Sequence, residues 1–145
     1  MNRYAAIALS LLIPALAQGQ EAEKFDAARL EKDFAPMAVF HQKGKVVDNE
    51  AIVARDDSRD SLHAVYVVRA KLDKAVAFYK EKLGVEPKTE GSEELGTLKY
   101  VFTIAPKSGD KRIHKATVEP TSQAGRLQIS LLRRALTDEE RESLE

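Results

Sequence analysis

The strongest constraint on the fold lies between residues 62 and 84, where a strand pattern changes directly into a helix pattern. Residues 62–69 are rich in valine and include a tyrosine, a composition typical of a largely buried strand. Four apolar residues then recur at the spacing of one helix face, with offsets of 0, 4, 7 and 11: Leu72, Val76, Tyr79 and Leu83. Gly84 follows and can adopt the left-handed conformation that ends many helices. This helix must bury one face against neighbouring strands.

Three further strand patterns follow the helix. Residues 98–105 alternate between large apolar side chains and other residues, which is typical of a strand with one apolar face. A turn at 106–110 leads to a more polar strand at 112–119, and a turn at 121–125 leads to a last strand around 127–131. Strands joined by short turns pair antiparallel. The order β-α-β-β-β therefore predicts an α+β fold, with an antiparallel sheet and one main helix packed on one face.

The chain ahead of this core gives weaker signals. A mixed-charge stretch that stops at Pro36 predicts an N-terminal helical segment over residues 18–35. Residues 37–61 contain short β-leaning pieces separated by turn residues and end in an acidic, serine-bearing loop. We therefore expect a single α+β domain over residues 36–134, to which an extra N-terminal helix and short β pieces are added.

The C-terminal end carries a helix-start signature. Thr137 and Glu140 have the spacing of a capping box, in which each side chain bonds the backbone N–H of the other residue. Acidic residues dominate the positions that follow. The sequence therefore predicts a short acidic helix within residues 135–145.

Residues 1–17 have the order of a secretory signal peptide. Arg3 supplies a positive charge, and residues 5–17 are almost purely apolar and end in the small-x-small triplet Ala-Leu-Ala. This apolar run is shorter than the roughly 20 residues that span a bilayer as a helix. We therefore expect cleavage between Ala17 and Gln18 and a soluble product in the bacterial periplasm or secreted medium.

Composition excludes several classes of function. The chain contains no cysteine, which rules out disulfides, thiolate metal sites and a cysteine nucleophile. Its 23 basic residues balance its 23 acidic residues, whereas nucleic-acid-binding proteins usually carry a strong basic excess. The sequence also lacks the common serine-hydrolase, phosphate-loop, dinucleotide and zinc-protease motifs. We therefore expect a protein without enzymatic activity, cofactor or nucleic-acid partner.

Basic residues gather near the end of the domain. Seven of them lie in residues 107–134, against Asp110 and Glu119: Lys107, Lys111, Arg112, Lys115, Arg126, Arg133 and Arg134. This excess favours an anionic partner, such as an envelope component or an acidic protein surface. It is equally typical of the solvent face of an antiparallel sheet. The sequence leaves both interpretations open.

The segment AVYVVRAKLDKAVAFYKEKLG, residues 64–84, resembles small exported bacterial proteins of uncharacterised function. In these proteins a strand and a polar turn lead into a similar helix, which a β-meander follows. The resemblance covers roughly residues 36–133 and brings no recognised catalytic motif. It implies a non-catalytic binding or interaction module in the bacterial periplasm or envelope. The usual Asp-Ser-Pro cap before the helix is replaced here by Ala70-Lys71-Leu72.

The same segment also resembles a single module of the vicinal oxygen chelate superfamily, the glyoxalase and bleomycin-resistance proteins. That resemblance implies a metal-dependent lyase or dioxygenase as the alternative function. His63 would match the first metal ligand and Glu119 a carboxylate ligand, with His114 as a further imidazole. Members pair two modules around the metal, and residues 18–60 contain no second helix-plus-meander unit.

The strand pattern also predicts where His63 points. Alternation places it on the same side as Val65 and Val67, opposite the larger Tyr66 and its neighbours. Because the helix should cover the side with the larger residues, we expect His63 on the outer face, too far from His114 or Glu119 to share one ion.

Overall fold

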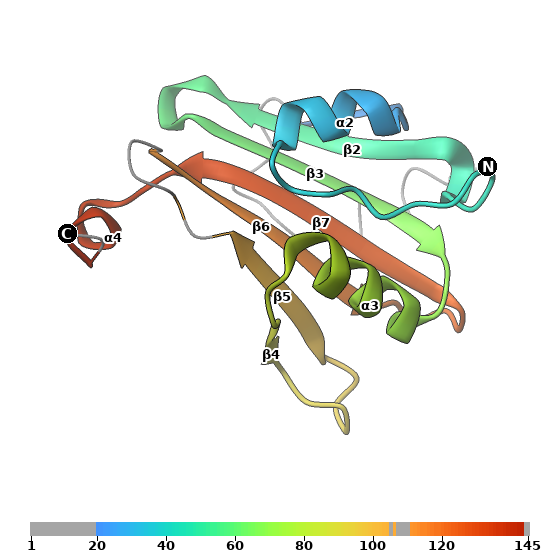
Figure 1. Ribbon diagram of the computed structural model, residues 1–145. Coiled ribbons are helices and arrows are strands. Elements are labelled where there is room, and N and C mark those ends of the chain that lie inside the picture. The colour runs from blue at the N-terminus through green and yellow to red at the C-terminus, as the bar shows by residue number, and fades with distance from the viewer. Residues whose placement is uncertain (1–19, 105, 107–110, 144–145) are drawn as a thin grey trace.

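The computed structural model describes residues 20–104, 106 and 111–143, and Figure 1 shows their arrangement. These residues form one antiparallel sheet with the strand order β1-β2-β3-β7-β6-β5-β4, which confirms the predicted α+β class. The strands are β1 Gln20–Lys24, β2 Glu50–Asp56, β3 Ser61–Arg69, β4 Lys88–Glu90, β5 Lys99–Ile104, β6 Arg112–Pro120 and β7 Arg126–Ala135. The helices are α2 Ala27–Phe34, α3 Leu72–Leu83 and α4 Asp138–Ser143, with 3-10 turns at Val47–Asn49 and Asp57–Arg59.

The predicted core appears in the expected order. Strand β3, helix α3 and strands β5, β6 and β7 follow the sequence pattern closely, and β7 continues as far as Ala135. Gly84 ends α3 with a φ of 66°, and its N–H donates to the carbonyl oxygen of Lys80 at 2.9 Å. The glycine therefore has the left-handed conformation that its position predicted.

Two short strands differ from the sequence expectation. Residues 20–24, expected within the N-terminal helical segment, form β1 and pair with β2. Helix α2 starts only after Asp26, whose side chain accepts a hydrogen bond from the N–H of Arg29 at 3.2 Å. Likewise, β4 lies in a segment for which no strand was expected, and it pairs with β5. Both lie at an edge of the sheet, where pairing with a distant strand outweighs weak local preference.

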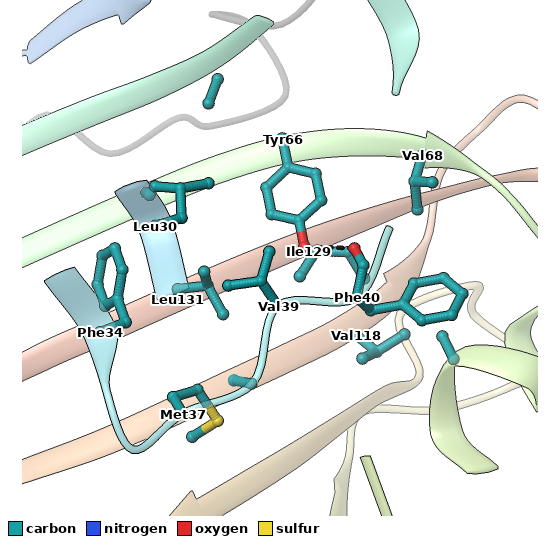
Figure 2. Close-up of a cluster of buried hydrophobic side chains, with 14 of the residues drawn as sticks. Leu30, Phe34, Met37, Val39, Phe40, Tyr66, Val68, Val118, Ile129 and Leu131 are labelled. Carbon is teal, nitrogen blue, oxygen red and sulfur yellow. Dashed lines mark hydrogen bonds between the residues drawn. The ribbon is translucent and has the colours of Figure 1, made fainter. Parts of the chain in front are cut away.

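The core lies between one face of the sheet and the helices. Figure 1 shows α2 and α3 in front of the same face. Alternate residues of β3, namely Leu62, Ala64, Tyr66 and Val68, point into this core and are at most 1% exposed. Figure 2 shows two of them, Tyr66 and Val68, on the same side of the sheet as labelled residues of α2, of the segment after it and of β6 and β7. The predicted inner face of β3 is therefore confirmed.

The capping box of the C-terminal helix is also confirmed. The N–H of Thr137 donates to Glu140 Oε1 at 2.9 Å, and the N–H of Glu140 donates to Thr137 Oγ1 at 3.2 Å. Arg134 holds the same carboxylate through two hydrogen bonds of 2.8 and 3.1 Å. These bonds, that from Arg134 above all, lower the pKa of Glu140 to about 2. Helix α4 is thereby tied to the end of β7.

Candidate binding groove

The three candidate ligands of a metal-dependent enzyme, His63, His114 and Glu119, lie apart in the fold. His63 is paired with Leu132, which pairs with Lys115, so His63, Lys115 and Glu119 share a face. Glu119 is four residues beyond Lys115, about 13 Å along the strand. His114, next to Lys115, points to the opposite face. The sheet therefore does not bring these side chains to one point, and the described residues include no His, Cys, Asp and Glu group that could hold a metal ion.

Two of the candidate metal ligands, Glu119 and His63, have surroundings that do not require a metal ion. Glu119 accepts a hydrogen bond from the side-chain amide of Gln128 at 3.0 Å. Burial lowers the pKa of His63, because a partly desolvated imidazole resists protonation. His63 lies on the face opposite α2 and α3, as the strand alternation predicted.

The basic stretch does not form one positive surface. Strand alternation sends Arg112 and Arg133 to the helix-covered face, but Lys115 and Arg134 to the other. Arg112 makes a bidentate contact with Asp60 at 3.0 and 2.9 Å, which lowers the pKa of that carboxyl. Arg134 pairs with Glu140 in the same way. Of the predicted basic residues, Lys107 lies outside the described residues.

A shallow groove opens instead between the end of α2, the segment 35–41 and α3. Its volume is about 390 Å³, within the range of roughly 300 to 1,000 Å³ typical of small-molecule sites. The residues that line it, here called the α2–α3 groove, are Glu31, Ala35, Pro36, Met37, Ala38, Val39, His41, Phe78 and Lys82. Six of these nine side chains are apolar, and the other three can carry charge.

The wall formed by segment 35–41 is fixed from beneath. Met37, Val39 and Phe40 are at most 5% exposed and join the core, as Figure 2 shows. The carbonyl oxygen of Phe40 accepts a hydrogen bond of 2.6 Å from the hydroxyl of Tyr66, and its N–H donates to Tyr79 Oη at 3.2 Å. Both backbone groups of Phe40 are thus satisfied by buried tyrosines. The groove wall is therefore preformed.

These tyrosines are held in their neutral form. Burial raises the pKa of Tyr66 well above its ordinary value, and burial likewise raises the pKa of Tyr79. A buried phenolate would lose its hydration without gaining a cation. The two hydroxyl groups therefore act as hydrogen-bonding supports rather than as acids or bases.

The opposite wall presents an aromatic ring beside a cation. Phe78 packs edge-on against Phe40 at 5.2 Å and against Tyr79 at 5.1 Å between ring centroids. The ammonium of Lys82 lies 6.0 Å from the centroid of the Phe78 ring. Glu31 and His41 complete the polar part of the lining. Within the described residues, no ion pair neutralises Glu31 or Lys82, so both charges remain available to a ligand.

The sequence did not reveal this groove. Its lining comes from two stretches about 40 residues apart, and the segment around Ala38 was expected as a β-leaning piece. Phe78 adjoins Tyr79 of the predicted helix stripe, but only Tyr79 is fully buried. The helical position of Phe78, beside the stripe rather than in its centre, is the one signal that could have marked it.

Comparisons with known proteins give no direct assignment: no protein family, no curated protein and no solved structure matches the chain. In the part of the chain that the structure describes, no helix has the length and apolar character needed to cross a membrane. The groove and the surfaces of the sheet are therefore the features that bear on the function of this protein.

Proposed function

We propose that this protein is an exported, non-catalytic binding module of the bacterial periplasm or envelope, and that the α2–α3 groove is its ligand site. The groove carries the proposal because it combines a preformed apolar lining with a few polar groups at a volume suited to a small ligand. The sequence order of residues 1–17 supports export.

The lining favours an amphipathic ligand. Pro36, Ala38 and Phe78 offer an apolar surface on which an aromatic or branched group can pack. Lys82 stands beside that ring and suits a carboxylate or another anionic end group. The proposed ligand class is therefore a small molecule, or the end of a peptide, with an apolar body and an anionic group.

Two other candidates have less support. An anionic partner at residues 107–134 would meet arginines that already bind carboxylates, since Arg112 pairs with Asp60 and Arg134 with Glu140. A metal-dependent lyase or dioxygenase would need His63, His114 and Glu119 at one point, and the register of the sheet separates them.

Chemical-shift mapping with 4-phenylbutyrate as the probe tests the proposal. Backbone amides of residues 37–41 and 78–82 should shift in a saturable way, and Ala38→Trp, which fills the groove, should abolish the shifts. Ala77→Trp is the control, because Ala77 is exposed on α3 and does not line the groove. Saturable binding that survives Ala38→Trp, or no binding at any probe concentration, would refute the proposal.

A further inference from the structure

The face of the sheet opposite α2 and α3 is unusually apolar. Antiparallel sheets with one free face normally place polar residues on it. Here the register aligns apolar side chains from three adjacent strands on that face, which we call the back face: Ile52, Ala54, Val65, Val67 and Leu132. None of them belongs to the core cluster beneath the helices, yet Val65 is 1% exposed and Ile52 7%. In the unprocessed chain this second surface is therefore also kept from water.

No described helix or strand packs over the centre of the back face. Helices α2 and α3 lie on the other side of the sheet (Figure 1), and α4 meets Arg134 at one end of β7. After cleavage before Gln18, only two residues precede β1 at Gln20. Among the described residues, the processed chain therefore offers no element that covers this face, and a second molecule can supply one.

The chemistry of the back face favours a second copy of the chain. Its centre is uncharged, because Gln128 and Ser130 separate the apolar residues of β3 from Lys115 and Glu119 on β6. A symmetric dimer places like patches against each other, so an uncharged centre avoids repulsion. A lipid headgroup or nucleic-acid partner would be expected to meet basic side chains, and the centre of the back face carries no Lys or Arg among the described residues.

The size of the back face also suits a dimer. Strands β3, β6 and β7 are 9, 9 and 10 residues long. At about 3.3 Å per residue and about 4.8 Å between strands, these three strands together with β2 of 7 residues and β5 of 6 residues offer on the order of 650 Å². A standard interface buries about 800 Å² on each partner. Two such faces can stack with aligned strands at about 10 Å, as in a β-sandwich.

We propose that the processed chain forms a symmetric dimer through its back face, with Val65 and Ser130 near the centre of the interface. The inference rests on the export and processing of the proposed function, and it adds a self-association surface on the side away from the groove. The groove stays open in such a dimer because it lies on the helix-covered side.

The test uses the full chain, exported by a bacterial host and recovered as the host processes it. Intact mass first establishes whether residues 1–17 were removed. Sedimentation equilibrium should then give twice the mass of the processed chain. Val65→Arg should yield a monomer, with a dissociation constant raised by more than about tenfold. Ala77→Arg, on the exposed side of α3, should leave the dimer unchanged.

A cysteine variant gives a second measurement that does not depend on the stability of Val65→Arg. The chain has no native cysteine, so Ser130→Cys introduces a single thiol at the centre of the back face. Mild oxidation should link two copies of Ser130→Cys but not of Ala77→Cys. A processed chain that stays monomeric, including one that instead binds a different protein, overturns the dimer. If residues 1–17 are retained, the proposed processing and the dimer that depends on it are wrong. The proposal that the groove binds a ligand is then still decided by the chemical-shift experiment.

Discussion

The hydroxyl of Tyr66 donates a hydrogen bond of 2.6 Å to the carbonyl oxygen of Phe40, 26 residues earlier in the chain. This bond joins the central strand β3 to the irregular segment that forms one wall of the groove. Figure 2 shows it among the apolar side chains of the core. A residue in the middle of the sheet therefore fixes the shape of a surface site.

Removing this hydroxyl should destabilise the protein. Tyr66→Phe leaves the buried carbonyl of Phe40 without its partner, at a cost of about 1–3 kcal/mol in the free energy of unfolding. Urea unfolding measures the loss. Tyr100→Phe is the matched control, since Tyr100 is only partly buried, and it should change stability by less than about 0.5 kcal/mol. Equal stabilities of the two variants would show that the bond contributes nothing.

Two alanines on α3 offer a matched test of how the helix packs. Ala75 is fully buried, whereas Ala77 is exposed. Ala75→Asp buries an unpaired carboxylate and should cost several kcal/mol, on the order of the whole stability of a small domain. Ala77→Asp should change the melting temperature by only a few degrees. Similar melting temperatures would contradict the orientation of α3.

His63 should make stability depend on pH. Burial places its folded pKa below the ordinary value of 6.5, so the unfolded chain binds more protons between the two values. The free energy of unfolding should therefore fall as the pH drops through 6.5 toward the folded pKa. Denaturation curves from pH 8 to 5 measure this slope. His63→Gln should make the slope of the free energy of unfolding against pH shallower. An identical slope in this variant would show that other groups cause the pH dependence.

The attachment of α4 should resist acid. Because the pKa of Glu140 is lowered to about 2, its stabilising contribution is present above the unfolded value of about 4.5 and is lost only as the pH falls through about 2. Glu140→Gln removes the charge and should speed amide hydrogen exchange within residues 138–143 at neutral pH. Glu139→Gln, an exposed neighbour, should leave the exchange rates unchanged.

The sequence predicted the elements whose patterns are local. The inner face of β3, the glycine stop of α3 and the capping box of α4 each depend on residues within one strand or one helical turn. The edge strands β1 and β4 escaped prediction because backbone pairing with β2 and β5 holds them, and side-chain patterns do not record such pairing. The groove was not predicted because its lining residues are distant in sequence, and only the folded structure brings segment 35–41 next to Phe78.

The strand order also sets when the fold can form. Strand β7, the last in the chain, lies between β3 and β6 and pairs with both. Until residues 126–135 are present, β1-β2-β3 and β4-β5-β6 are two half-sheets with no strand joining them. Synthesis through residue 135 must therefore precede assembly of the seven-stranded sheet. Before β7 is made, the chain can hold at most these two separate half-sheets, and the last strand to be synthesised is the one that joins them.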